Sequence, residues 1–80
     1  MARRVSEEQQ HAAALQAARR MIARGERPGY RIRPAQDGSW TVDGLPGVRV
    51  AGDTKRAALT AARTAIATVL EVDPESFDLA

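Results

Sequence analysis

The 80-residue sequence predicts an α+β domain with the order α-β-β-β-α, in which both helices pack on one face of a three-stranded antiparallel meander. Two long stretches without glycine or proline, residues 7–24 and 55–72, are typical of helices. Between them, short alternations of apolar and polar residues are separated by turns rich in glycine and proline, which is typical of strands. This length corresponds to a single domain, residues 1–80.

The first helix is expected over residues 7–24. Ser6 is a suitable N-cap residue, and Gln9 three positions later completes a capping box. Gly25 suits the position that follows the last helical turn. Residues spaced by three and four positions share one face, which is weakly apolar and should dock on another surface. This face consists of His11, Leu15, Ala18 and Ile22.

A linker, residues 26–29, leads into the strands, which are expected over residues 30–33, 40–43 and 48–50. Residues 34–38 form the first turn, in which Asp37-Gly38 is a pair that hairpins favour. Residues 44–47 form the second turn, made by Pro46 and Gly47. Alternation with period two directs one set of apolar residues toward the helices. This set is Ile32, Val42, Val48 and Val50.

The second helix is expected to begin at Lys55. Gly52 and Asp53 break the third strand, Gly52 supplies backbone freedom, and Thr54 is the N-cap. The helix has a broad apolar face of mostly small residues, which allow close approach to a sheet. These residues are Ala58, Ala62, Ala65, Ile66 and Val69. The acidic tail, residues 73–80, either frays or folds back through Phe77 and Leu79.

Composition argues against an enzyme. The chain has no cysteine and one histidine, so no metal or cofactor site is expected. His11 has no visible catalytic partner, and Asp37, Asp43 and Asp53 lie near turns, where aspartate commonly serves the backbone. No signal peptide or membrane-spanning apolar run is present, so a cytoplasmic protein without membrane contact is expected. Eleven arginines and sixteen alanines suggest a GC-rich bacterial genome.

Charge is segregated along the chain although the net charge is only +2. Residues 1–36 are strongly basic, and the last ten residues are acidic. Period two also places Arg31, Arg33 and Arg49, with Thr41 and Asp43, on the sheet face opposite the helices. We expect this face to bind a partner, either nucleic acid or an acidic protein surface.

The segment from Tyr30 to Ile66 resembles the HicB-like antitoxin domain. The likeness rests on Asp37-Gly38-x-Trp40-x-Val42, on Leu45-Pro46-Gly47-Val48, on Gly52-Asp53-Thr54 and on the alanine-rich helix that follows. That family joins a strand hairpin ending in Leu-Pro-Gly to a third strand, a Gly-Asp-Thr cap and an alanine-rich helix, which corresponds to residues 30–72 here. The resemblance implies a non-catalytic antitoxin that neutralises a small ribonuclease toxin by direct protein–protein contact.

Two other resemblances imply nucleic-acid binding. The order of elements is similar to that of the double-stranded RNA-binding domain, whose basic helix start grips phosphates; Lys55 and Arg56 are the matching residues. The strand meander also resembles the arm-binding modules of integrases, which implies that Arg31, Arg33 and Arg49 read DNA. The alternative hypothesis is therefore a small RNA- or DNA-binding domain. A third hypothesis is a homodimer that pairs the weakly apolar face of the first helix with its copy.

Overall fold

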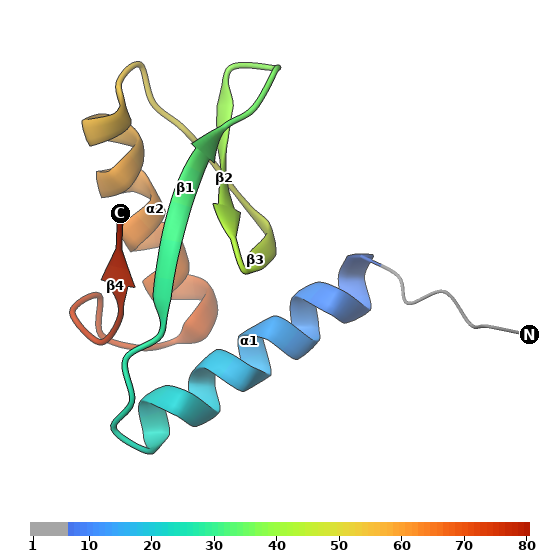
Figure 1. The fold of residues 1–80 in the computed structure, drawn as a ribbon, viewed down its shortest axis with the longest axis vertical. Coiled ribbons are helices and arrows are strands. Elements are labelled where there is room, and N and C mark those ends of the chain that lie inside the picture. Colours follow the sequence, from blue (N-terminus) through green and yellow to red (C-terminus); the bar gives the residue numbers. More distant parts are fainter. Residues whose placement is uncertain (1–6) are drawn as a thin grey trace, which may run out of the picture.

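A computed structural model describes residues 7–80 and confirms the predicted α+β class and order of elements. The predicted N-cap, Ser6, lies outside the described residues. Two helices and four strands follow one another along the chain (Figure 1). They are α1 (Glu7–Ala23), β1 (Gly29–Pro34), β2 (Ser39–Asp43), β3 (Leu45–Ala51), α2 (Lys55–Leu70) and β4 (Asp78–Leu79).

The strands form one mixed sheet in the order β3-β2-β1-β4. The two pairings of the predicted meander, β1 with β2 and β2 with β3, are antiparallel, whereas β4 runs parallel to β1. The acidic tail therefore folds back, which was one of its two predicted alternatives, and it adds a fourth strand that the sequence did not predict. Main-chain hydrogen bonds hold it there: Asp78 N donates to Pro28 O at 2.9 Å, and Ala80 N donates to Tyr30 O at 3.0 Å.

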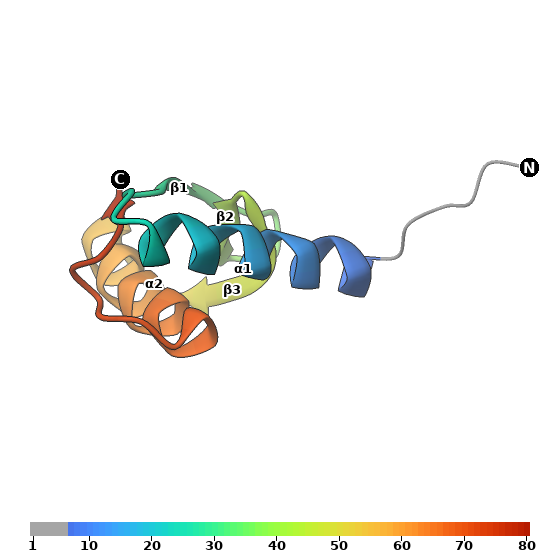
Figure 2. The same cartoon turned by 90° about the horizontal axis from the view of Figure 1, so that it is seen from below.

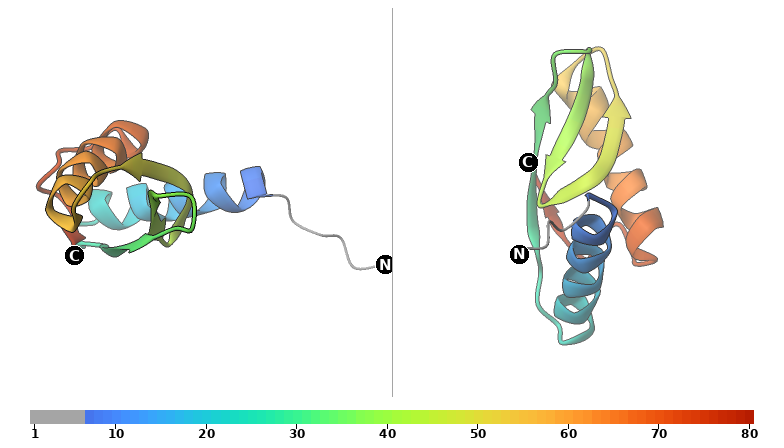
Figure 3. Two further views of the ribbon diagram at one scale, coloured as in Figure 1. Left: turned by 90° about the horizontal axis from the view of Figure 1, so that it is seen from above. Right: turned by 90° about the vertical axis from the view of Figure 1, so that its right-hand side faces the viewer.

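The two helices take different positions on the sheet. Helix α2 runs alongside the strands, and α1 crosses near the end of the sheet where the β2–β3 turn lies (Figures 1 and 3). There α1 packs against β3 and against α2. Its first turns extend beyond the sheet (Figure 2).

The core lies between the sheet and the helices. Its buried strand residues include the predicted Ile32, Val42 and Val48, and Val50 packs at its margin. From α2 it takes Ala58, Ala62, Ile66 and Leu70, and from the folded-back tail it takes Phe77, which is fully buried. Ala18 of α1 is also buried, with Leu15 and Ile22 packed against the cluster. The weakly apolar face of α1 thus packs largely within one molecule, through Ala18 and with Leu15 and Ile22 half-buried, and the homodimer stays a prediction.

The second predicted turn is wrong in its position. The chain reverses at Gly44, whose φ of +93° suits glycine, and β3 begins directly at Leu45. Pro46 and Gly47 therefore lie within β3 and not in a turn. The register jumps there: Thr41 faces Arg49, but the next residue, Val42, faces Leu45. This irregularity lets Leu45 and Val48 both point into the core, where they are 0% and 5% exposed.

Gly47 and Gly52 are required by close contacts rather than by unusual backbone angles. A Cβ on Gly47 would lie 2.6 Å from the His11 ring, and a Cβ on Gly52 would lie 2.6 Å from the backbone nitrogen of Ala58. Gly47 N also donates a hydrogen bond of 3.2 Å to Nδ1 of His11, which fixes α1 on β3. The predicted role of Gly52 as a flexible joint is thus replaced by tight packing of β3's end on α2.

The predicted helix cap is confirmed. Thr54 has extended backbone angles, and its hydroxyl oxygen accepts a hydrogen bond of 3.1 Å from Ala57 N. At the other end, Glu71 takes a left-handed conformation with a φ of 56°, and the helix stops at Leu70, two residues earlier than predicted. Asp53 lies exposed in the loop before the cap.

Three arginines hold the end of α2 and the segment that follows it, and two of them, Arg19 and Arg27, are distant in sequence. Arg19 donates to Leu70 O and Val69 O, and Arg63 donates to Pro74 O at 2.7 Å. Arg27 donates to Glu75 O at 2.7 Å and forms an ion pair of 3.0 Å with Asp78. Two ion pairs therefore join the basic first half to the acidic end, Arg19 with Glu71 at 3.6 Å and Arg27 with Asp78.

Candidate binding site on the open face of the sheet

The strands present an exposed surface on the side opposite the helices, which we call the open face. It carries Arg31 and Arg33 from β1, Thr41 and Asp43 from β2, and Arg49 from β3. All are exposed except Thr41, which is half-buried. The sequence prediction thus placed these five residues on the correct side, because the side chains of a strand alternate between its two faces.

Register aligns three of these residues in a row across the sheet. Arg33 faces Thr41 on the neighbouring strand, and Thr41 faces Arg49 on the next. Neighbouring strands are about 4.8 Å apart, so the two arginines are separated by about 10 Å at the backbone. Arg31 lies one step along β1, opposite Asp43.

Carboxylates already engage the two arginines of the row. Nε of Arg33 lies 2.6 Å from Oδ2 of Asp43, its diagonal neighbour, and Nη1 of Arg49 lies 3.1 Å from Oδ2 of Asp37. All four side chains are between 46% and 66% exposed, and exposed ion pairs of this kind contribute at most about 1 kcal/mol each. The pairs nevertheless lower the positive charge that Arg33 and Arg49 offer to a partner.

Asp37 is held firmly at the hairpin between β1 and β2. Its Oδ1 accepts hydrogen bonds from Ser39 Oγ at 2.6 Å and from Ser39 N at 3.0 Å. These bonds, with the nearby charge of Arg49, lower the pKa of Asp37 below its ordinary value. The prediction that Asp37 serves the turn is confirmed, and the same carboxylate also orients Arg49 over the sheet. Asp43, in contrast, binds a side chain and not its own backbone.

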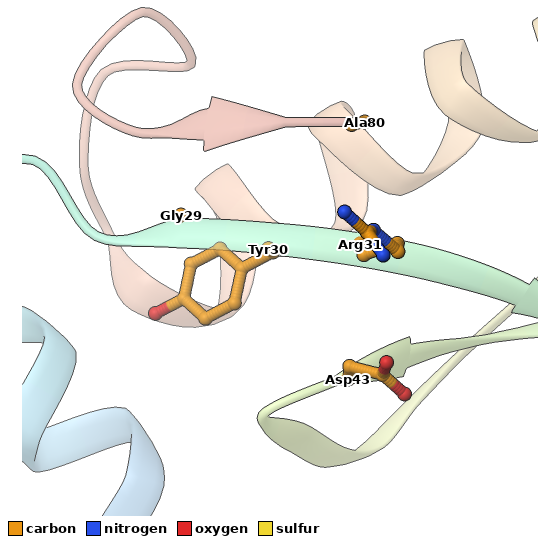
Figure 4. A pocket seen from close by; sticks show the side chains of 5 residues that line it. All are labelled: Gly29, Tyr30, Arg31, Asp43 and Ala80. Atoms are coloured by element: carbon orange, nitrogen blue, oxygen red, sulfur yellow. The ribbon is translucent and has the colours of Figure 1, made fainter.

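Arg31 differs from the other two arginines of the open face. Within residues 7–80 its side chain makes no hydrogen bond or ion pair. It lines a pocket of about 380 Å³ together with Gly29, Tyr30, Asp43 and Ala80 (Figure 4). In Figure 4 Arg31 and Asp43 extend from adjacent strands, β1 and β2. An anion that enters the pocket would therefore meet a guanidinium group that has no other partner in the described chain.

The other two predicted binding residues lie elsewhere. Lys55 and Arg56 occupy the first turn of α2, which belongs to the helical layer and not to the strands. Both side chains are exposed, and neither is paired with another described residue. Cations at a helix N-terminus are on the unfavourable side of the helix dipole, so a bound anion would relieve this repulsion. The five predicted residues thus form two groups on different elements.

The sequence did not single out Tyr30 or Gly29 as site residues. Tyr30 packs edge-to-face on Phe77 with ring centroids 6.1 Å apart, and partial burial raises the pKa of its hydroxyl. Gly29 was predicted as the end of the linker, but it begins β1 and so lies on the same face as Arg31. The wall at Ala80 depends on β4, which had no signal in the sequence.

The described residues contain no group of three or more histidine, cysteine, aspartate or glutamate side chains that could hold a metal ion. Neither helix of the described chain is long and apolar enough to cross a membrane. Comparisons of the chain with protein-family models, with curated proteins and with solved structures find no match.

Proposed function

We propose that this chain is a HicB-like, non-catalytic binding module that neutralises a small ribonuclease toxin by direct protein–protein contact. The proposal rests on the resemblance carried by the segment from Tyr30 to Ile66. Its support in the structure is that both glycines of the motif lie at close packing contacts and that the predicted cap residue caps the helix. Gly47 meets His11, Gly52 meets Ala58, and Thr54 caps α2. These residues of the resemblance thus have structural roles in this fold.

The open face is the surface proposed for the partner. Its mixture of arginines with Asp37 and Asp43 suits another protein, because interleaved charges of both signs give a protein interface its specificity and register. A nucleic-acid backbone would meet two carboxylates among the three arginines, so the face offers it little net positive charge. Protein contact is therefore placed ahead of nucleic-acid binding.

Co-expression tests this function. A small toxin gene adjacent to the gene for this chain would be expressed in a bacterial host, alone and together with the chain, and growth and co-purification would be measured. We expect growth to be restored by the wild-type chain and by Arg20→Glu, which changes an exposed, unpaired arginine on α1. The triple variant with Arg31, Arg33 and Arg49 changed to glutamate should fail to restore growth. Absence of a complex and of rescue with wild type would refute the proposal.

Nucleic-acid binding is the second candidate, because Lys55 and Arg56 are exposed and unpaired at the start of α2. Labelled double-stranded RNA, double-stranded DNA and single-stranded RNA would be titrated at about 50 and 200 mM salt, a range over which phosphate contacts weaken strongly. Salt-sensitive binding that is lost when both residues become glutamate would establish this function. Binding that is equal in the variant would exclude these two residues as its basis.

A further inference from the structure

The pocket beside Arg31 offers a binding site for a single carboxylate. We infer that Arg31 is the anchor of the open face and receives a glutamate or aspartate side chain from an acidic segment of a partner protein. This inference rests on the proposed function, since it names the partner chemistry of the same face. Three observations carry it: the charges of the face, the free guanidinium and the shape around it.

Charge on the open face is concentrated at one residue. The face has three arginines and two carboxylates, and Asp43 and Asp37 are taken up by Arg33 and Arg49. Arg31 is the arginine of the face that no described carboxylate neutralises. A guanidinium group matches a carboxylate with two parallel hydrogen bonds, and such charge-assisted pairs are roughly twice as strong as neutral ones.

Asp43 pairs with Arg33 and not with Arg31, so the guanidinium group of Arg31 stays free to bind a partner. Asp43 directly faces Arg31 across the strands, yet its Oδ2 binds Nε of the diagonal Arg33 at 2.6 Å. The carboxylate of Asp43 remains on the pocket wall, where its second oxygen is suited to accept an N–H group from the partner's main chain. A partner that presents a carboxylate next to a main-chain donor would complement both walls.

Shape adds a second requirement. Gly29 lies two residues before Arg31 on β1 and therefore on the same face. A Cβ added to Gly29 would meet no atom within 4 Å, so a side chain there fits the fold but fills space at the pocket. The glycine thus leaves room for an inserted side chain, and it provides a variant that blocks the pocket without changing charge.

The same features disfavour a nucleic acid in this pocket. Phosphates follow one another along a nucleic-acid backbone, and each one that passed the face would approach Asp37 or Asp43 as well as an arginine. An acidic protein segment places one carboxylate at Arg31 and turns neutral main chain toward the carboxylates of the sheet. The pocket therefore suits a protein carboxylate better than a phosphate of a nucleic acid.

The test is an amide-resolved NMR titration of the full chain with a capped pentaglutamate peptide, at about 0.15 M salt, where charges farther apart than about 8 Å are screened. We expect the amide signals of residues 29–31 and 43 to shift. Arg31→Glu and Gly29→Val should each weaken binding at least about tenfold, and Arg31→Lys should lie between them and wild type, because lysine keeps the charge but loses the fork. Arg20→Glu makes the same charge change on α1 and should bind as wild type does. Circular dichroism would verify that every variant is folded.

Each other outcome overturns the inference. Equal binding by Arg31→Glu and Arg20→Glu would mean that net charge alone attracts the peptide. Normal binding by Gly29→Val would mean that the pocket is not entered. Shifts centred on Lys55 and Arg56, or tighter Arg31-dependent binding of an oligothymidine of matched charge, would assign the contact to another surface or to nucleic acid.

The co-expression assay separates this inference from the proposed function. Toxin rescue that persists in Arg31→Glu, with no peptide binding at Arg31, would remove the inference and leave the proposed function standing. Peptide binding at Arg31 in a chain that neutralises no toxin would do the reverse. The failure of one claim can therefore be distinguished from the failure of the other.

Discussion

At the scale of single residues, a side chain added at Gly47 or at Gly52 would strike neighbours that differ in how easily they can move. An added Cβ at Gly52 would meet the backbone of Ala58, with its nitrogen at 2.6 Å and its Cα at 2.9 Å, and a helix backbone cannot move aside. At Gly47 it would meet the His11 side chain, which can rotate. We therefore expect Gly52→Ala to lower the free energy of unfolding by about 3 kcal/mol and Gly47→Ala by only about 1 kcal/mol, as measured by urea denaturation.

Two controls accompany this comparison. Gly29→Ala should change stability by less than about 0.5 kcal/mol, because the site is open. In a His11→Ala background the obstacle at Gly47 is gone, so Gly47→Ala should become nearly neutral. If Gly47→Ala lowered the free energy of unfolding equally in both backgrounds, the added methyl group would not be striking His11. The double-mutant cycle measures this coupling.

Asp37 supplies a prediction about pH. Hydrogen bonds from Ser39 hold its pKa below the ordinary value of 3.8, so the ionised carboxylate stabilises the folded state at higher pH. This contribution should be lost as the pH falls through the lower, folded-state pKa. Melting temperatures of wild type and Asp37→Asn should therefore differ at neutral pH and converge at about pH 2. A difference that stays constant over the whole range would contradict this assignment.

At the scale of elements, β4 depends on partners that are distant in sequence. Arg27 binds Glu75 O and the Asp78 carboxylate, and β4 itself has only two residues. We expect Arg27→Ala to increase amide hydrogen exchange at Asp78 and Ala80 severalfold, while global stability falls by about 1 kcal/mol or less, because the pair is exposed. Arg24→Ala, which removes only the local pair with Glu26, should leave that exchange unchanged.

The same dependence explains which elements the sequence could predict. Both helices and the three strands of the meander have local signals: Thr54 as a cap, alternation around Ile32 and Val42, and a Gly at the hairpin. The short β4 has none, since pairing with β1 and the distant Arg27 determine it. The start of β3 was missed because Pro46-Gly47 is typical of a turn, whereas here it forms an irregular piece of strand.

Prediction of the site was limited in a similar way. Alternation alone placed Arg31, Arg33 and Arg49 on one face. Which of them is neutralised depends on register and on the exact place of Asp37 and Asp43, and neither is encoded in spacing along one strand. The predicted face of three arginines with Asp43 therefore becomes, in three dimensions, a nearly balanced face with one unpaired arginine.

At the scale of the whole molecule, the basic first half and the acidic end belong to one folded unit. Phe77 is fully buried, lies edge-on to Tyr30 and has the Arg63 guanidinium 5.6 Å above its ring. The segment that contains it joins the sheet on β1 and is tied to the linker by Arg27 and to α2 by Arg63. The last ten residues should therefore unfold with the rest and not before it.

Phe77→Ala tests this cooperativity. Truncation of a buried phenylalanine costs about 3–5 kcal/mol, against a total of roughly 5–15 kcal/mol for a small domain. The single tryptophan, Trp40, lies on β2, which β1 separates from β4, and its Nε1 donates a hydrogen bond to Gly52 O. Tryptophan fluorescence and circular dichroism should therefore show the same loss of stability in one transition. Phe77→Leu, which retains most of the buried volume, should lose much less. If Trp40 kept its native transition while exchange at Asp78 became free, the tail would be a separate, dispensable strap, and the pocket wall at Ala80 would lose its place in the site.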